Sequence, residues 1–490
     1  MNYRMMARFV SGMIAVEAAF MLPALLIAFF GDRNSLESIG FLVSMVLAAG
    51  LAFLLYHFSK EAKGGFYARE GLVCVSVGWI VLSILGSLPF LLSGAIPRPI
   101  DAMFEIVSGF TTTGASILTE VESLPKGILY WRSFSHWLGG MGVLVFLLVV
   151  MPNNATQAKS KSTGFTLHLL RAESPGPSVG KLVPKMRQTA VILYFIYLVL
   201  TILNVIFLLI GQLPVFDAFC IAFGTAGTGG FGIKNDSLGS YSPYIQNVTT
   251  VFMILFGVNF TCYYLLAYGK IKSVLKDEEL RLYFGIIAAA ILLITLNVKD
   301  MFASVGEAVH HAAFTVGSII TTTGYGTVDF DKWPSFSKSI ILFLMIVGAC
   351  AGSTGGGMKC SRVVLLFKGL HRNIKQVIHP QVVQTVRVND RVIDEAVLAN
   401  TNAYLSAYVI MIIISMMVIS IDGFSIEATI SSVLCTLNNI GPGLAEAGPT
   451  CNFSAFSDVS KAVMIFDMLA GRLELFPILA LFSRSTWRKM

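Results

Sequence analysis

Four short polar stretches that contain glycine recur along this chain of 490 residues. Threonine hydroxyls and successive backbone carbonyls are oxygen ligands that can replace the hydration shell of a cation. Glycine is needed where successive carbonyls must point to one axis, because that geometry requires backbone angles closed to other residues. The residue types therefore predict a site for a dehydrated cation. The stretches are Phe110-Thr111-Thr112-Thr113-Gly114-Ala115, Thr225-Ala226-Gly227-Thr228-Gly229-Gly230-Phe231, Ile320-Thr321-Thr322-Thr323-Gly324-Tyr325-Gly326 and Leu437-Asn438-Asn439-Ile440-Gly441-Pro442-Gly443.

The spacing of these stretches indicates a fourfold repeat. Aligned on the glycines at 114, 229, 324 and 441, they are separated by 115, 95 and 117 residues. Each separation holds a long apolar segment, a connection, a second long segment and a short one, which is typical of a repeat architecture. A single Thr-Thr-Thr-Gly is weak support for a pore, because threonine and glycine are common in ordinary loops. Four copies in register favour a pore over that alternative. Phenylalanine precedes three of the glycines by ten residues, at Phe104, Phe219 and Phe314, and Ser431 takes that place in the fourth copy.

The third stretch, Thr322 to Gly326, is close to the filter loop of potassium channels. The second stretch departs from the pattern, because Ala226-Gly227 stand where the first has two threonines, and the fourth has Asn439-Ile440. Fewer hydroxyls there leave backbone carbonyls as the expected ligands. The predicted filter residues are Thr112, Thr113, Gly114, Gly227, Thr228, Gly229, Thr322, Thr323, Gly324, Asn439, Ile440 and Gly441.

The segments that must position these stretches are membrane-spanning helices. The chain is 55% hydrophobic and only 13% charged, with a mean hydropathy of +0.75, which excludes a disordered chain and an ordinary soluble enzyme. A helix needs about 20 apolar residues to cross the bilayer. Such windows lie near 9–30, 37–58, 71–93, 129–151, 188–211, 245–269, 280–298, 336–367 (interrupted), 401–421 and 461–483.

Four shorter apolar segments cannot cross the bilayer and are predicted to be re-entrant helices. Irregular backbone persists at membrane depth only where it is buried in protein or lines a water-filled cavity, so four such loops should converge on one axis. The C-terminal ends of inward-running helices carry partial negative charge, which favours a cation. The segments lie near 101–113, 216–227, 307–322 and 425–437.

The basic residues predict the orientation of the chain. With a cytoplasmic N-terminus, 23 lysines and arginines fall on the cytoplasmic side and nine, Arg132 among them, on the other, so both termini are expected in the cytoplasm. The polar connections 152–187 and 368–400 then face the cytoplasm, where they would dock a partner or contact lipid headgroups. The seven cysteines form no CxxC pair and are expected to be buried free thiols.

A glycine-rich run, Gly348 to Lys359, interrupts one predicted span, and its five glycines disfavour a continuous helix. It departs from a phosphate-binding loop, because the lysine comes one residue late and Cys360 replaces Ser/Thr. We interpret the run as an unwound segment below the filter, with a passive kink as the alternative.

Isolated charges inside predicted spans are candidates for function. Arg472 lies within the last span, where a structural pair with Asp467 or Glu474 is the alternative. Glu17, in the first span, is expected to pack against a helix. Acidic residues near the starts of the short segments suit the helix dipole and would also attract cations; these are Asp101, Asp217, Glu307 and Glu427.

The chain resembles the Trk/Ktr/HKT superfamily of potassium transport proteins over essentially its whole length. The run Trp131-Arg132-Ser133-Phe134-Ser135-His136-Trp137-Leu138-Gly139-Gly140-Met141-Gly142 resembles the second helix of the first unit in the bacterial TrkH/TrkG branch. The resemblance implies an all-α polytopic membrane protein of four fused helix–pore-helix–helix units around one central pore. The expected divisions are a two-helix extension (1–60) and pore units 61–152, 153–272, 273–378 (with a gate loop at 348–357) and 379–490.

The same resemblance implies potassium-ion uptake across the bacterial inner membrane, with K⁺ as the permeating ion, because glycine occupies the centre of all four filter loops. It further implies a homodimer and a cytosolic nucleotide-binding regulatory subunit of TrkA type, besides membrane lipids, and no nucleic acid. No organic cofactor and no enzymatic activity are expected. The membrane potential would drive uptake, channel-like or with ion coupling. The gate residues it implies are Gly348, Gly352, Gly355, Gly356, Gly357, Lys359 and Arg472.

Two other functions remain as alternatives. A secondary transporter with a midplane site for another small cation or solute would have inverted repeats and a pair of broken helices, whereas this repeat runs in one direction. A membrane enzyme or receptor would need a cluster of titratable groups, and the sequence offers none.

Overall fold

The computed structural model of the chain describes residues 1–32, 34–60, 68–142, 186–381 and 384–487. Within these residues the protein is helical, and its only strands are β1 (Arg387–Val388) and β2 (Arg391–Val392), which form a small antiparallel ladder. The predicted all-α polytopic fold is therefore confirmed. Most of the connection 152–187 lies outside the described residues, as do Lys63, Lys489 and Arg488 of the orientation count.

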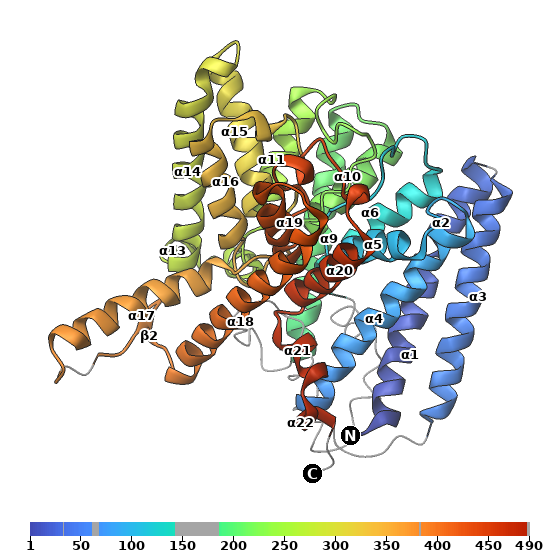
Figure 1. Cartoon of the computed structure of the whole chain (residues 1–490), viewed down its shortest axis with the longest axis horizontal. Helices are drawn as coiled ribbons and strands as arrows, with labels where there is room; N and C mark the ends of the chain where they lie inside the picture. The colour runs from blue at the N-terminus through green and yellow to red at the C-terminus, as the bar shows by residue number, and fades with distance from the viewer. Residues whose placement is uncertain (33, 61–67, 143–185, 382–383, 488–490) are drawn as a thin grey trace.

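Six described helices are long and apolar enough to span a membrane on their own, and a seventh span results if one bent pair is counted. The start of α1 and the last described helix, α22 (Arg484–Trp487), lie at the same end of the molecule (Figure 1). Many apolar side chains on the long helices are exposed, as expected for surfaces that face lipid. The long helices are α1 (Tyr3–Phe20) with its continuation α2 (Leu22–Leu26) and the π-helix η1 (Ile27–Asp32), α3 (Ser35–Phe58), α4 (Ala68–Leu92), α9 (Met186–Ile210), α14 (Glu278–Val298) and α18 (Glu395–Ile419).

The four predicted re-entrant segments are short helices that each begin with an acidic residue in the first turn. At the start of α15, Ser304 Oγ accepts from the Glu307 N–H, and the Glu307 carboxylate accepts from the N–H of Ala303, one residue before the N-cap, in an arrangement close to a capping box. The predicted role of these acids at helix starts is confirmed there. The four helices are α5 (Pro99–Phe110), α10 (Val215–Gly227), α15 (Val305–Ile320) and α19 (Ile426–Asn438).

Of the helices that follow the four filter stretches, the last three are interrupted, which corrects the prediction of a single interruption, and the first ends at Gly140, just before the described residues stop. The predicted windows 245–269 and 461–483 each contain a break between two helices. The sequence analysis missed both breaks because a hydropathy window averages over them. Gly257 ends one helix and Asn259 caps the next, so the pair bends by 89°. The second window breaks where Glu474 and Leu475 adopt positive φ. The helices concerned are α6 (Lys126–Gly140), α11 (Pro243–Phe256) with α12 (Phe260–Ala267), α16 (Ser335–Val347) with α17 (Cys360–Ile378), and α20 (Asp458–Arg472) with α21 (Phe476–Phe482); α13 (Ile271–Leu275), α22 (Arg484–Trp487) and the short helices η3 (Lys299–Met301), η4 (Phe330–Lys332), η5 (Ser420–Asp422), η6 (Ala445–Ala447) and η7 (Phe453–Ala455) complete the structure.

The short helices pack in a cyclic order. Each one contacts the helix that follows the filter stretch of the preceding repeat: α10 contacts α6, α15 contacts α11, α19 contacts α16, and α5 contacts α20. The last contact joins the C-terminal repeat to the first and closes the ring. Helices α1 and α3 lie outside this ring beside α4 (Figure 1).

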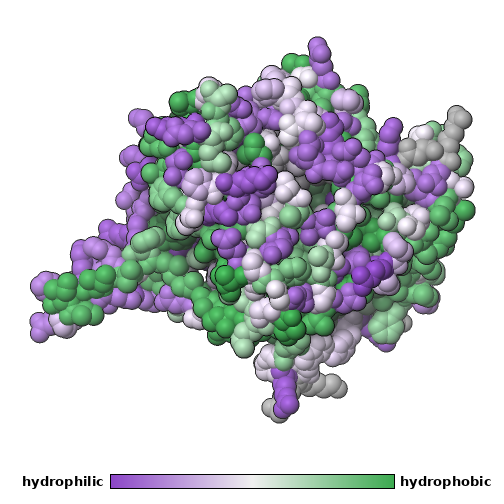
Figure 2. Space-filling view, turned by 45° about the horizontal axis from the view of Figure 1, so that its top comes forward, coloured by the Kyte–Doolittle hydropathy of each residue, from purple (hydrophilic) through white to green (hydrophobic). Residues whose placement is uncertain are grey.

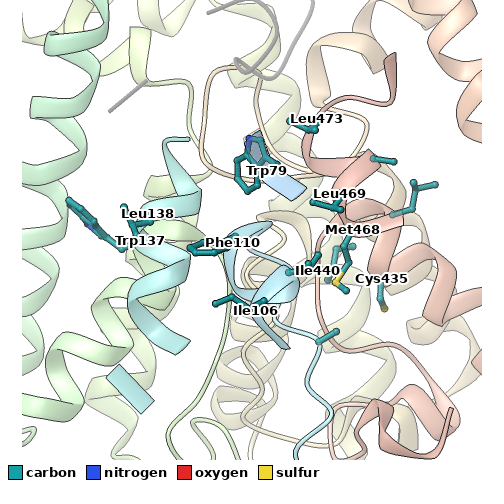
Figure 3. Packing of buried hydrophobic residues seen from close by; sticks show 14 of the residues in the cluster. Trp79, Ile106, Phe110, Trp137, Leu138, Cys435, Ile440, Met468, Leu469 and Leu473 are labelled. Carbon is teal, nitrogen blue, oxygen red and sulfur yellow. The ribbon is translucent and has the colours of Figure 1, made fainter. Parts of the chain in front are cut away.

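The buried core surrounds the short helices. Figure 3 shows Ile106 and Phe110 of α5 close to Ile440, with Met468 and Leu469 of α20 beside it. All seven cysteines are free, and six of them are buried. The prediction of buried thiols holds for those six, and Cys451 is the exposed exception.

Candidate ion pathway

The four filter stretches share one backbone conformation directly after their short helices. One residue in each adopts a left-handed conformation: Thr112, Thr228, Thr322 and Asn439 have φ values of 58°, 56°, 58° and 55°. The next residue donates its N–H to the carbonyl five residues earlier, at 2.8 to 2.9 Å in every copy. The donors and acceptors are Thr113 and Ser108, Gly229 and Gly224, Thr323 and Ser318, and Ile440 and Cys435.

This backbone pattern corrects the alignment of the second stretch. Its counterpart of Gly114 is Gly230, with φ of 75°, rather than Gly229. Gly229 instead corresponds to Thr113, and Gly227 to Thr111. Ten residues before Gly230 stands Cys220, which is buried, whereas Phe219 is 42% exposed. The phenylalanine pattern therefore holds only for Phe104 and Phe314.

The four glycines of the corrected alignment lie against one another in a ring. A methyl group on Gly114 would collide with the carbonyl oxygen of Gly229, and one on Gly230 would collide with that of Thr323. A methyl group on Gly324 would meet the Ile440 carbonyl oxygen, and one on Gly441 would lie 2.9 Å from that of Thr113. Each loop thus contacts the next, and the fourth returns to the first.

The first and third loops share a side-chain arrangement that the other two lack. In the first and third, two threonine hydroxyls hydrogen bond to each other, Thr111 to Thr113 at 2.8 Å and Thr321 to Thr323 at 2.7 Å. In the second loop those positions are glycines, and in the fourth they are Asn438 and Ile440. The Asn439 Nδ2 of the fourth loop donates to Thr113 Oγ1 at 2.9 Å and so ties the fourth loop to the first.

The glycine-rich run between α16 and α17 is non-helical, as predicted, and contacts the filter loops. The Gly356 N–H donates to Thr322 Oγ1 at 2.6 Å, and the Gly356 backbone lies against the carbonyl of Asn438. Its other face meets the break between α11 and α12, where the Cys350 N–H donates to Gly257 O at 3.0 Å. The run is therefore attached both to the filter loops and to a neighbouring interrupted helix.

Arg472 connects the filter, this run and α6. Its guanidinium donates to Thr112 Oγ1 at 3.4 Å and to Thr354 O at 3.0 Å. It also donates to Gly140 O at 2.6 Å and to Gly139 O. Carbonyls in the last turn of α6 are suitable partners for a cation.

The charged residues near Arg472 have partners of their own. Glu474 pairs with Arg362, and Asp467 accepts a hydrogen bond from Ser415 at 2.9 Å. Lys359 is buried and donates to the carbonyl of Gly355 within the glycine-rich run. The predicted gate residues Arg472 and Lys359 thus bind neighbouring carbonyls of the glycine-rich run, those of Thr354 and Gly355.

The predicted acidic residues at the outer ends of the short helices are partly paired. Asp101 accepts from Lys461 at 2.7 Å, and Glu427 lies 3.6 Å from Lys338. In a loop outside the spans, a hydrogen bond from Ser425 at 2.7 Å lowers the pKa of the Glu446 carboxyl below its usual value. The two ion pairs offset part of the negative charge of these acidic residues, whereas Glu446 stays ionised.

Three residues that the sequence analysis did not assign to the site lie directly behind the first two loops. Arg132, counted there among the outer basic residues, is buried and pairs with Glu105 of α5 at 2.8 Å. His136 lies between the first two filter loops. The sequence did offer a signal for the ion pair: Glu105 and Arg132 each carry the only formal charge beyond the first turn of an apolar helix. Such charges are rarely unpaired in a membrane.

Comparisons with known proteins place the chain among cation transport proteins. Residues 38–489 match the family model TrkH, described as a cation transport protein. The chain is 34% identical to the Trk system potassium uptake protein TrkH of Salmonella typhimurium over 496 residues, with all of both chains covered. It is 30% identical to TrkG of Escherichia coli K12, with 96% of this chain and 95% of that protein covered.

A solved structure has the same fold. The crystal structure of the potassium transporter TrkH from Vibrio parahaemolyticus superimposes with a TM-score of 0.88 at 31% sequence identity, and all of both chains is covered.

Proposed function

The chain belongs to the TrkH family of cation transport proteins, and from this premise we propose that it takes up K⁺ through the ring formed by its four filter loops. It is a multi-pass membrane protein of a cation transport family, and it is a transporter rather than an enzyme. The names of its full-length relatives support potassium as the ion.

The observation that carries the proposal is the closed contact between the loops. The carbonyls of Thr113, Gly229, Thr323 and Ile440 each lie against the glycine of the neighbouring loop. Oxygens from four sides can replace the hydration shell of a monovalent cation, and short helices that end at the ring direct partial negative charge towards it. Gly230 joins the proposed filter as the counterpart of Gly114.

The proposed gate is the glycine-rich run, 348–357, together with Lys359 and Arg472. Its contacts with Thr322 and Asn438 support a position below the filter. Arg472 adds a positive charge that would restrain cation flow until the run moves. Regulation by a cytosolic nucleotide-binding subunit, assembly as a homodimer, and an inner-membrane location with both termini in the cytoplasm are part of the proposal and rest on the family resemblance and the charge distribution.

The proposal is tested in a bacterial strain that requires added potassium because its own uptake systems are deleted. Expression of the wild-type chain should restore growth at low K⁺ and Rb⁺ uptake into cells, and Gly324→Ser should abolish both. The matched control is Gly285→Ala, at a helical position where an added methyl group meets no neighbour. Uptake of Na⁺ and Rb⁺ at equal rates by the wild type would contradict potassium selectivity.

A further inference from the structure

His136 of α6 is a buried side chain wedged between the first two filter loops. Its Nδ1 lies 2.8 Å from Gly109 O of α5, and its Nε2 lies 3.2 Å from the Phe231 amide nitrogen. A backbone N–H can only donate, so Nε2 accepts, and Nδ1 carries the proton that it donates to Gly109 O. The geometry therefore assigns the neutral tautomer with hydrogen on Nδ1.

The ring of His136 also supports the backbone that carries a filter carbonyl. A methyl group on Gly229 would collide with the imidazole, and the ring centroid of Phe231 lies 4.3 Å from that of His136. The carbonyl of Gly229 in turn lies against Gly114 of the first loop. The imidazole thus packs behind the point where the first two loops meet.

A second tie lies at the same junction. Arg132, one helical turn before His136, donates from Nε to Glu105 at 2.8 Å and from Nη1 to Gly232 O at 3.2 Å. Its guanidinium lies 4.0 Å from the centroid of the Phe231 ring. Glu105 accepts from the Ile117 N–H at 3.0 Å, in the segment that follows the first loop. The buried ion pair thus joins the segments beyond both loops.

The other junctions use different side chains. Tyr325 of the third loop donates to Ile221 O of α10 at 3.1 Å, and Asn439 of the fourth donates to Thr113 of the first. At the junction of the first two loops, Gly229 and Gly230 have no side chain to offer. The side-chain hydrogen bonds described above come instead from His136 and Arg132 of α6.

We propose that His136 is a positioning residue for ion selectivity, which holds the Gly229 carbonyl at a fixed distance from the first loop, with Arg132 and Glu105 as a second tie. This inference rests on the proposed function. A filter selects by the size and field of its oxygen ring, so a loosened junction would admit ions of other sizes while transport continues. The role is distinct from packing alone, because it needs a donor on one side of the ring and an acceptor on the other.

The test compares His136→Ala, His136→Asn and His136→Gln in proteoliposomes, with the ratio of Rb⁺ to Na⁺ uptake as the readout. The Asn amide nitrogen takes the place of Nδ1 and can keep the bond to Gly109, whereas the Gln amide oxygen reaches towards Phe231. We expect His136→Ala to lower the ratio about tenfold, as befits the loss of two buried hydrogen bonds. The Asn and Gln variants, which each keep one bond, should lie between.

The matched control is Trp137→Phe, which removes a buried hydrogen bond from the adjacent residue of α6, to Thr201 rather than to a filter loop. It should leave the ratio unchanged while lowering thermal stability as much as the Asn and Gln variants do. An unchanged ratio in the histidine variants would overturn the inference alone. If His136→Ala does not fold, the Asn and Gln variants decide the question. A wild type without selective Rb⁺ uptake would overturn the proposed function and this inference with it.

Discussion

Arg472 contacts three parts of the pathway, and its charge can be tested separately from its packing. Arg472→Gln keeps a side chain that can donate to the Thr354 and Gly140 carbonyls but removes the charge. We expect Rb⁺ uptake to rise about fivefold, because roughly 1 kcal/mol of repulsion is removed from the path of a cation in a hydrated environment. Initial rates of ⁸⁶Rb⁺ uptake provide the measurement.

The control for Arg472 is Arg484→Gln, which removes an exposed cation near the C-terminus. An uptake rate that is unchanged or reduced in Arg472→Gln, with the protein present at the normal level in the membrane, would indicate a purely structural arginine.

Gly230 tests the corrected alignment of the second loop. Its φ of 75° and its contact with the Thr323 carbonyl make any side chain unfavourable there. Gly230→Ala is expected to lower the ratio of Rb⁺ to Na⁺ uptake by at least about tenfold, since a left-handed Ala alone costs about 1–2 kcal/mol. Equal ratios in Gly230→Ala and in the control Gly50→Ala, where an added methyl group meets no neighbour, would refute this alignment.

Three of the four proposed filter loops could be aligned from the sequence. In each of them a polar residue stands two positions before a glycine, as in Thr112-Thr113-Gly114, and the repeat spacing brings these glycines into register. The second loop was misaligned, because Gly227, Gly229 and Gly230 stand so close together that the repeat spacing alone does not select one of them. Only the backbone angles and the bond from Gly229 to Gly224 distinguish them. His136 and Glu105 were missed because their partners are backbone groups or residues distant in sequence.

At the scale of elements, the interrupted helices explain how irregular backbone is held below the filter. The sequence predicted the interruption in the third repeat, where glycines are dense. It missed the break at Gly257 to Asn259, because the flanking apolar residues dominate a hydropathy window. The two breaks are joined by a hydrogen bond from the Cys350 N–H to the Gly257 carbonyl. Backbone groups that have no partner within their own helix are thereby satisfied.

The glycine-rich run provides the prediction at this scale. Deletion of Gly355, Gly356 and Gly357 removes the bond to Thr322 and shortens the segment that lies under the third and fourth loops. We expect faster Rb⁺ uptake in the absence of any regulatory subunit, because the obstruction is withdrawn. Proteoliposomes that contain the chain alone provide the measurement.

For this deletion the control is Gly369→Ala, in α17, where an added methyl group meets no neighbour. Intact uptake and intact response to a regulatory subunit after the deletion would identify the run as a passive kink.

For the whole molecule, the charge distribution predicts that both termini are cytoplasmic. Cys451 is the one exposed cysteine and lies in the loop before α20, at the opposite end of that helix from the C-terminal segment. A membrane-impermeant maleimide added to intact spheroplasts should therefore label the wild-type chain and not Cys451→Ser. Labelling of Cys451 only after the membrane is opened would reverse the orientation.

The exterior of the molecule agrees with a protein that is largely embedded in lipid. Figure 2 shows apolar residues on the flanks and in the lower part of the face in view, with polar residues gathered in its upper and central part. The order of helices along the chain and their short or long character could be predicted from hydropathy and spacing. The cyclic packing of each short helix against the preceding repeat could not, because nothing in a linear pattern specifies which repeats become neighbours.

The central claim is that four loops form one selective site for K⁺, and a density map tests it most directly. The protein should be imaged in Rb⁺, which replaces K⁺ and scatters anomalously, and again in Na⁺. We expect an Rb⁺ peak on the axis among the carbonyl oxygens of Thr113, Gly229, Thr323 and Ile440, and no such peak in Na⁺. An Rb⁺ peak elsewhere in the membrane region, with none among these four oxygens, would contradict it.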